Sequence, residues 1–177
     1  MELQTAIESR RSVREYAARP VEKEKLVAIL KAAQLAPTWK NSQTPRYYVA
    51  AGEALPAVRA ALPEGNRKKT ADAAVLIVQT FVKDVSGFNT ADGTPDNELG
   101  NGWGAYDAGL QAQNLLLKAT ELGLSTLVMG LRDADALRAA LDIPEEEIVT
   151  AVIAVGYSEA DPPMRPRKPL EEIAKFV

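Results

Sequence analysis

A short basic segment near the N-terminus, Arg10-Arg11-Ser12-Val13-Arg14, carries the side chains best suited to binding a ligand. In an extended chain alternate side chains share a face, so we expect Arg10, Ser12 and Arg14 on one side and the two intervening residues on the other. Guanidinium groups bind phosphate oxygens in bidentate pairs, and a serine hydroxyl adds a neutral donor. The segment therefore favours a phosphorylated ligand, although by itself it also fits a solvated basic turn after a first helix.

Three further polar segments lie where helices and strands are expected to join. They are residues 37–43 (Pro-Thr-Trp-Lys-Asn-Ser-Gln), residues 66–69 (Asn-Arg-Lys-Lys) and residues 165–167 (Arg-Pro-Arg). The first could be an exposed helix-ending loop with its tryptophan packed over the edge of the core, and the second a solvated surface turn. The third could be a stiff basic tail, or a proline-rich ligand motif, because Pro163 and Pro166 are three residues apart.

The sequence contains no cysteine and no histidine. A disulfide, a thiolate nucleophile, an iron–sulfur cluster and a cysteine zinc site are therefore excluded, as are the Ser-His-Asp triad and the commonest transition-metal ligand. Carboxylate, lysine and tyrosine chemistry remains open, as does a carboxylate magnesium site. If the protein is an enzyme, an organic cofactor that carries the difficult chemistry is an attractive explanation.

Length and composition are those of an ordinary globular protein. A chain of 177 residues, 46% of them hydrophobic and 25% charged, is long enough for one domain with a sizeable core. The net charge of -3 and the pI of about 5.2 argue against nucleic-acid binding. The longest apolar run, residues 73–78, is too short to span a bilayer, and the first residues do not resemble a signal peptide. We therefore expect a cytoplasmic protein with no nucleic-acid or membrane partner.

Helices and strands are expected to alternate along the chain. Apolar residues at helical spacing, with proline and glycine at the ends, predict helices at residues 2–9, 22–36, 54–62, 103–122 and 133–141. Runs of β-forming residues predict strands at residues 47–51, 73–81, 126–129 and 148–157, of which the second is expected to be buried on both faces. This alternation predicts a sheet covered by helices, in an α/β or α+β domain.

Several of these regions carry a more specific expectation. The helix at residues 103–122 is apolar nearly all round, which is typical of a central helix or of one at a subunit interface. Residues 83–102 form a long polar loop, which in a compact domain is usually functional or disordered. Residues 65–69 are expected to be a basic connector, and residues 161–169 an extended proline-rich stretch.

In this combination and order, the motifs resemble those of the FMN-dependent nitroreductase family over nearly the whole chain. The family begins with an Arg-x-Ser-x-Arg/Lys motif and has an Arg/Lys-x-Arg motif near its C-terminus. Between them lie an Ala-Pro-Ser/Thr and Asn-x-Gln pair, an Asn and Lys before an Asp-Ala strand, and a Gln-Asn-Leu helix followed by Gly-Leu-Gly/Ser. The matching residues are Arg10, Ser12, Arg14, residues 36–38, Asn41, Gln43, Asn66, Lys69, Asp72, Ala73, residues 113–115, residues 123–125, Arg165 and Arg167. Two features depart from the family pattern: Thr44-Pro45-Arg46 stands where Pro-Trp is common, and the C-terminal arm is short.

The resemblance implies an α+β fold with a central, mostly antiparallel sheet flanked by helices, in a single FMN-binding domain over residues 1–177. It also implies a homodimer with two FMN sites at the interface. Family enzymes are oxidoreductases that take a hydride from NADH or NADPH and then reduce a second small molecule in the same pocket, a ping-pong mechanism. The expected acceptors are nitroaromatics, quinones and similar flat electrophiles. The resemblance leaves open a specialised reductase or oxidase of the dehalogenase or azoline-oxidising kind, with residues 83–102 as a lid, and also a non-enzymatic FMN-binding protein.

The resemblance further implies roles for individual residues, with no metal ligand and no side chain that acts as a nucleophile. The FMN phosphate would be held by Arg10, Ser12, Arg165 and Arg167, with Arg11 in the same basic segment. The pyrimidine edge of the ring would be faced by Arg14, Asn66 and Lys69, where positive charge favours the reduced form. The other subunit would contribute Pro37, Thr38, Trp39 and Asn41. The backbone of Met129 and Gly130 would approach flavin N5.

Overall fold

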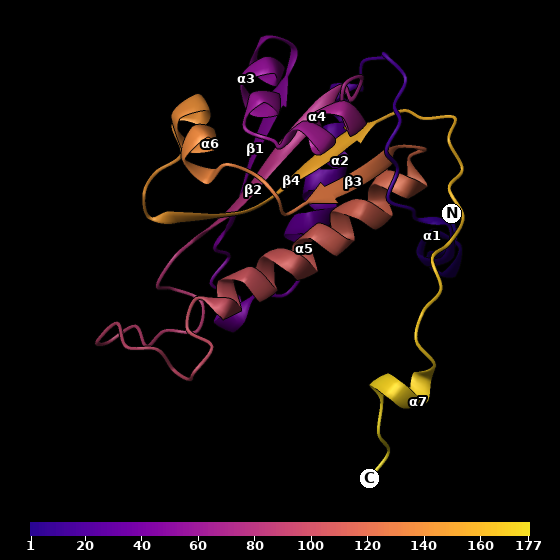
Figure 1. Cartoon of the computed structure of the whole chain (residues 1–177). Coiled ribbons are helices and arrows are strands. Elements are labelled where there is room, and N and C mark those ends of the chain that lie inside the picture. The colour runs from indigo at the N-terminus through magenta and orange to yellow at the C-terminus, as the bar shows by residue number, and fades with distance from the viewer.

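A four-stranded sheet forms the centre of the protein in the computed structural model, which describes residues 1–177 (Figure 1). Its strands are β1 (Pro45–Ala51), β2 (Val75–Val82), β3 (Ser125–Met129) and β4 (Glu147–Gly156). They lie in the order β1-β2-β4-β3, and every pairing is antiparallel. The predicted α+β fold with an antiparallel sheet is therefore confirmed.

The two central strands are buried on both faces, as was predicted for the strand at residues 73–81. Ile77 of β2 pairs with Ile153 of β4, and both side chains belong to the core that packs under helices on one face of the sheet. Val78 pairs with Val152, and both belong to the core on the opposite face. Successive residues of a strand point to opposite faces, so an unbroken apolar run supplies both cores at once.

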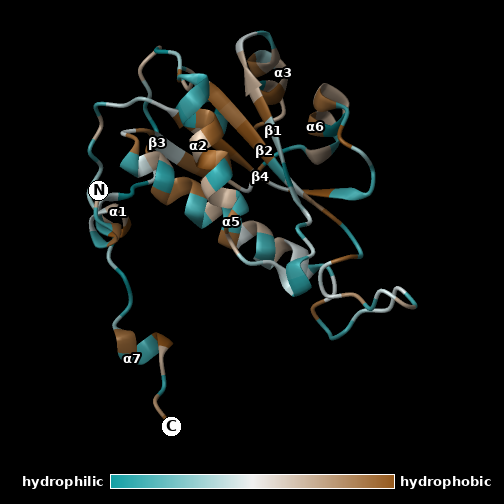
Figure 2. Cartoon of the chain, turned by 180° about the vertical axis from the view of Figure 1, so that it is seen from behind, coloured by the Kyte–Doolittle hydropathy of each residue, from teal (hydrophilic) through white to brown (hydrophobic).

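Helices cover both faces of the sheet. They are α1 (Leu3–Ser9), α2 (Lys23–Gln34), α3 (Leu55–Ala60), α4 (Glu64–Lys69), α5 (Gly102–Glu121), α6 (Ala134–Leu141) and α7 (Leu170–Ile173), with short 3-10 turns η1 (Trp39–Asn41) and η2 (Gly52–Ala54). Helices α2 and α5 pack on the Ile77 face, and α3 and α6 on the Val78 face. The strands are mostly hydrophobic, whereas the helices alternate hydrophobic and hydrophilic stripes (Figure 2). None of the helices is long and apolar enough to cross a membrane.

The basic connector predicted at residues 65–69 is wrong, because these residues form helix α4. Pro63 stands just before the helix in an extended conformation, where a proline cannot disturb the helical hydrogen bonds. Lys68 pairs with Glu64 one turn earlier at 2.6 Å, and the Thr70 hydroxyl donates to the Asn66 carbonyl at the C-terminal end. The glycine at position 65 and the run of like charges concealed this short helix in the sequence.

Helix α5 buries more of its apolar surface within its own chain than its sequence suggested. Leu115 and Ala119 are fully buried against α2 and the sheet. The exposed stripe contains Tyr106, Gly109 and Gln113, and is therefore neither strongly apolar nor continuous. The central position predicted for this helix is confirmed, and the alternative of a place at a subunit interface stays a prediction.

The long polar loop between β2 and α5 is ordered and closed at its base. Asp84 and Asn101 pair reciprocally, because the Asp84 N–H donates to Asn101 Oδ1 and the Asn101 amide donates to Asp84 Oδ1, both at 2.8 Å. Phe88 and Pro95 form an isolated antiparallel bridge nearer the tip. The loop extends away from the sheet at the N-terminal end of α5 (Figure 1).

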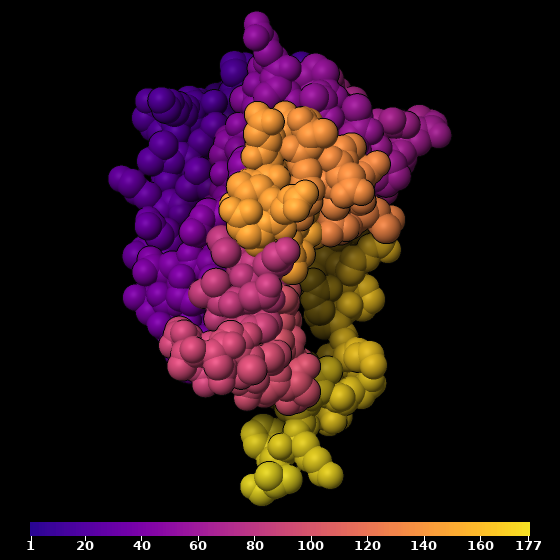
Figure 3. All heavy atoms as spheres, turned by 90° about the vertical axis from the view of Figure 1, so that its left-hand side faces the viewer, coloured from indigo at the N-terminus to yellow at the C-terminus, as the bar shows by residue number.

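After β4 the chain leaves the body as an extended tail that passes α1 and ends in α7 (Figure 1). Its proline-rich part is extended, as predicted. The last residues stand clear of the body (Figure 3), and Ile173 and Phe176 are 69% and 91% exposed. Both side chains therefore lie outside the hydrophobic core of the chain.

Candidate functional site

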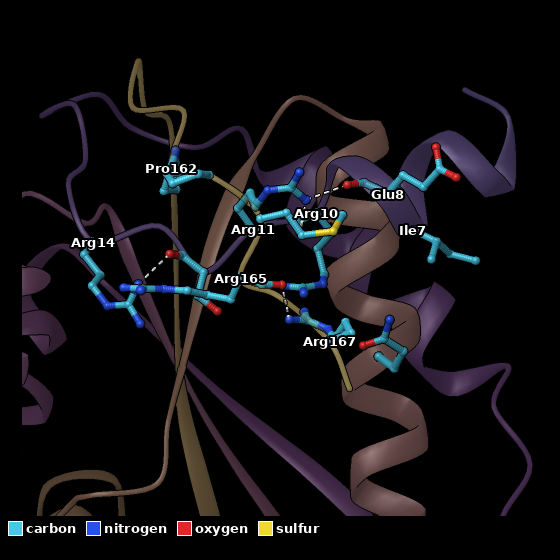
Figure 4. Close-up of a pocket in the computed structure, with 12 residues that line it drawn as sticks. Ile7, Glu8, Arg10, Arg11, Arg14, Pro162, Arg165 and Arg167 are labelled. Atoms are coloured by element: carbon cyan, nitrogen blue, oxygen red, sulfur yellow. Dashed lines mark hydrogen bonds between the residues drawn. The ribbon is translucent and has the colours of Figure 1, made fainter. Parts of the chain in front are cut away.

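Five arginines from the two ends of the chain line one cavity of about 480 Å³ (Figure 4). Its wall is formed by the end of α1, the basic segment, the tail and one residue of α5. The lining residues are Ile7, Glu8, Arg10, Arg11, Ser12, Arg14, Gln113, Pro162, Pro163, Met164, Arg165 and Arg167. The structure thus brings together all the residues predicted to surround a phosphate.

The basic segment is held in place through its single apolar residue. Val13 is 5% exposed, and its N–H donates to the Thr126 carbonyl of β3 at 3.0 Å. Ser12 forms a parallel bridge with the same threonine. The Tyr16 hydroxyl donates to the Val13 carbonyl at 3.1 Å, and burial raises the pKa of this phenol. Because the backbone is fixed against the sheet edge, the polar side chains on either side of Val13 project into the cavity.

Arg11 differs from the prediction that it would point away from its basic neighbours. It lines the same cavity, because its long side chain turns back over the end of α1. Its Nη1 donates to the Glu8 carbonyl at 2.5 Å and to the Arg10 carbonyl at 3.0 Å. The carbonyl groups at the C-terminal end of a helix carry partial negative charge, which accounts for this position.

None of the five guanidinium groups forms an ion pair with a carboxylate. Arg14 donates only to the Ser12 carbonyl at 2.9 Å, and Arg167 only to carbonyls of the tail, the nearer at 2.8 Å. The side chains of Arg10 and Arg165 make no hydrogen bond within the protein. Several cations around one cavity repel each other, so the site is complementary to an anion with more than one negative charge.

A second, smaller cavity of about 180 Å³ adjoins the first, and Arg14 lines both. It is bounded by Asn66 and Lys69 of α4 and by residues 127–131 at the end of β3 and just after it. The Asn66 side-chain amide donates to the Leu131 carbonyl at 3.2 Å, which fixes α4 against the end of β3. At Gly130 a Cβ atom would meet no other atom within 4 Å, so the backbone there faces open space. The residues predicted to face a flavin ring therefore do lie together.

The residues predicted to come from the other subunit line neither cavity. Pro37, Thr38, Trp39 and Asn41 lie at η1, beside the N-terminal part of α5. The Trp39 ring packs against Trp103 at 4.5 Å between centroids, which agrees with the alternative of a tryptophan over the edge of the core. Whether these residues contact a ligand held by a second copy stays a prediction.

Sequence reasoning missed six of the residues that line the arginine cavity. Gln113 had been noted only as part of a motif, although its place on the solvent side of α5 was readable from helical spacing. Pro162, Pro163 and Met164 precede Arg165 directly, so the extended conformation predicted for this stretch was the available signal. Glu8 and Ile7 carried no such signal, because the end of a short amphipathic helix has no distinctive composition.

Comparisons of the sequence and of the structure with known proteins identify relatives of this chain. The sequence model of the Nitroreductase family matches residues 7–157, so Arg165 and Arg167 lie beyond the matched range. A protein of Archaeoglobus fulgidus, provisionally named NADH dehydrogenase/NAD(P)H nitroreductase, is 31% identical over 156 residues, which are 85% of this chain and 82% of that protein. A crystal structure of a nitroreductase family protein from Clostridium difficile has a TM-score of 0.82 and 27% identity, and covers 99% of this chain and 98% of its own. A provisionally assigned nitroreductase from Desulfovibrio desulfuricans, crystallised in complex with FMN, has a TM-score of 0.79 and 26% identity over 100% of this chain and 97% of its own.

Proposed function

Because the chain belongs to the Nitroreductase family, we propose that it is an oxidoreductase that binds FMN, oxidises NADH or NADPH and reduces a flat electrophilic acceptor such as a nitroaromatic or a quinone. One observation carries this proposal. A cavity lined by five arginines that form no ion pair shares Arg14 with a second cavity, which is lined also by Asn66, Lys69 and residues 127–131. The first cavity thus matches a phosphate, and the second matches a heteroaromatic ring joined to it.

The first cavity suits the phosphate of FMN because of its donors. The Arg10 and Arg165 side chains have all their donors free, and Ser12 adds an exposed hydroxyl. A phosphate monoester carries nearly two negative charges at neutral pH and accepts hydrogen bonds on three oxygens. Binding it would pair these guanidinium groups and remove their mutual repulsion.

The second cavity suits the edge of the flavin ring. Arg14 and Lys69 supply positive charge, and Asn66 donates its side-chain amide to the Leu131 carbonyl just after β3. The open space at Gly130 allows a planar group to approach the chain more closely than any other residue would permit. When bound there, FMN would supply the two-electron chemistry, accepting a hydride from the nicotinamide and passing electrons to the acceptor. The chain's own residues bind the phosphate, orient the ring and place charge at its edge.

The proposal includes a homodimer in which η1 of one chain reaches the cofactor of the other. It is supported by the position of η1 outside both cavities and by the apolar tail, since Leu170, Ile173 and Phe176 have no apolar surface of their own chain to cover them. It also includes the single domain and the cytoplasmic location expected from the sequence.

The visible spectrum of the purified protein, recorded without oxygen before and after NADH or NADPH is added, tests this function. We expect a yellow protein whose absorption is bleached by one of the nucleotides and restored by a quinone. Chromatography of the chromophore released by heat should give FMN. Release of FAD, or a colourless protein that does not take up added FMN, would contradict the proposal. A yellow protein that no nicotinamide nucleotide bleaches would instead indicate a non-enzymatic FMN-binding protein.

A further inference from the structure

Asp107 is a buried carboxylate at the centre of a polar network outside both cavities. It is 2% exposed and pairs with no cation. Instead, both of its oxygens accept the Trp39 backbone N–H at 3.1 Å, and Oδ2 accepts the Ser86 hydroxyl at 2.7 Å. A buried charge without a cation is costly unless several donors surround it. These donors come from η1 and from the long loop, which are separate segments of the chain.

The hydrogen-bond directions in this network follow from the Ser86 hydroxyl. Its single proton is donated to Asp107 Oδ2, so the Ser86 oxygen can only accept from its other neighbours. The Ser42 and Thr44 hydroxyls lie 2.7 and 3.0 Å from the Ser86 oxygen, and both must therefore donate to it. Asp107 thus accepts hydrogen bonds from Trp39 and Ser86, and Ser86 in turn accepts them from Ser42 and Thr44.

The turn that Asp107 holds has an unfavourable backbone conformation. Lys40, Asn41 and Gln43 have φ values of 46°, 56° and 51°, in the left-handed region that residues other than glycine rarely adopt. Such residues persist where surrounding contacts determine the conformation, and they concentrate at functional sites. The Trp39 indole Nε1 is buried without a partner, so the backbone N–H, and not the indole, anchors the turn.

The long loop is attached to the same turn. Ser86 belongs to this loop, and Lys40 of the turn pairs with Asp96 of the loop at 2.9 Å. Trp103, whose ring packs on Trp39, donates its indole N–H to Asn97 of the loop at 2.8 Å. The turn, the loop and the start of α5 are therefore connected through Asp107 and the tryptophan pair.

We propose that Asp107 is a positioning residue that holds the turn at residues 38–43 in the conformation in which it contacts FMN, and that ties residues 84–101 to this turn as one unit. The contact with FMN rests on the proposed function. Asp107 itself touches neither cavity, so it would act only through the turn. A shift of the loop would then disturb the turn, because both depend on the same hydrogen bonds.

The two tryptophans report the position of the turn directly. They are the only tryptophans in the chain, and their rings are 48° apart at 4.5 Å, a skewed arrangement that gives an exciton couplet in far-ultraviolet circular dichroism. We expect Asp107→Ala to lose most of this couplet, with or without flavin present. We also expect it to weaken FMN binding by roughly tenfold or more, the scale of one lost hydrogen bond to a charged group.

Glu147→Gln is the matched control, because Glu147 is a second buried carboxylate, 6% exposed. It accepts hydrogen bonds from Thr80 and from Tyr48, which packs with the core on the Val78 face of the sheet, and from no residue of the turn. The substitution should cost stability but keep both the couplet and the FMN affinity. Asp107→Asn serves if the alanine variant does not fold. An amide keeps one acceptor for Trp39 and can donate to Ser86, so the same changes should occur to a smaller extent.

The outcomes separate this inference from the proposed function. A couplet retained in Asp107→Ala, or lost equally in Glu147→Gln, overturns the positioning role. A lost couplet with unchanged FMN affinity overturns the positioning role too, because the turn would then not serve the cofactor.

Ser86→Ala tests the link between the turn and the loop. It should speed hydrogen exchange in residues 84–101, and unchanged exchange overturns that link. A parent protein that binds no FMN refutes the proposed function, and the couplet then decides alone whether Asp107 holds the turn.

Discussion

Arg14 occupies the boundary between the two cavities, and its position distinguishes the roles of the basic residues. The arginines on its N-terminal side and in the tail surround only the larger cavity, whereas Lys69 borders only the smaller one. Charges beside a phosphate affect retention of the whole cofactor. Charges beside the ring affect the two redox states differently, because reduction adds negative charge there.

Arg10→Ala and Arg167→Ala should each weaken FMN binding by about 1.5–3 kcal/mol, the range for hydrogen bonds to charged groups. The larger effect is expected for Arg10, which is half-buried, because Arg167 is exposed to screening by solvent. Titration of each apoprotein with FMN measures the affinity. Arg19→Ala is the control, since this guanidinium stacks on the Tyr157 ring at 3.8 Å outside the cavity. Parent-like affinity in Arg10→Ala would remove that residue from the phosphate site.

Lys69→Met should keep the yellow colour but lower the two-electron potential of the bound flavin. The oxidised ring is neutral, so its affinity should barely change, whereas the reduced form loses an opposite charge worth about 1–4 kcal/mol. Potentiometry against a reference dye measures the shift. Lys68→Met is the matched control, because the adjacent Lys68 pairs with Glu64 on the surface. Equal potentials in the two variants would place Lys69 among the solvated residues of α4.

At the scale of elements, α5 joins the parts of the site. Its N-terminal part carries Asp107 and Trp103, and its middle contributes Gln113 to the arginine cavity. Such a helix must hold a fixed position on the sheet, and close contacts between it and β2 provide this. The glycines of the helix show where the contact is closest.

Gly104→Ala should destabilise the protein by about 1–3 kcal/mol, although alanine is the better helix former. A Cβ at Gly104 would lie 2.2 Å from the Phe81 ring, which is itself buried in β2. Gly109→Ala, on the exposed side of the same helix, meets nothing within 4 Å and should stabilise by about 0.5–1 kcal/mol. Urea unfolding of both variants measures this difference. The same sign at both positions would contradict the close packing of α5 on β2.

At the scale of the whole molecule, the exposed apolar tail predicts a dimer. Sedimentation at micromolar concentration should give about twice the chain mass of 19.1 kDa. Ile173→Asp should shift the equilibrium toward monomer, because it places a charge on an apolar surface expected to be buried. Glu172→Gln, in the same short helix, should leave the mass unchanged, since its exposed ion pair with Lys168 contributes little. A monomer that retains flavin would refute the dimer.

The sequence by itself determined the local features of this protein. The hydrophobic residues that make up most of β2 and β4 specify strands buried on both faces, because successive side chains of a strand point to opposite faces. The order of short motifs along the chain indicated the family, which the comparisons confirm. The long polar loop and the extended basic tail were also readable, since glycine, asparagine and proline act on the backbone of their own neighbourhood.

Only the tertiary structure decided which of these features meet. The arginines of the N-terminal segment and of the tail are about 150 residues apart in sequence, and their convergence depends on Val13 pairing with Thr126 at the sheet edge. In the sequence Asp107 resembles any polar residue on a helix, and its burial becomes visible only when η1 and the long loop are placed over it. Contacts across such separations are selected by the packing of the whole chain, and no local pattern records them.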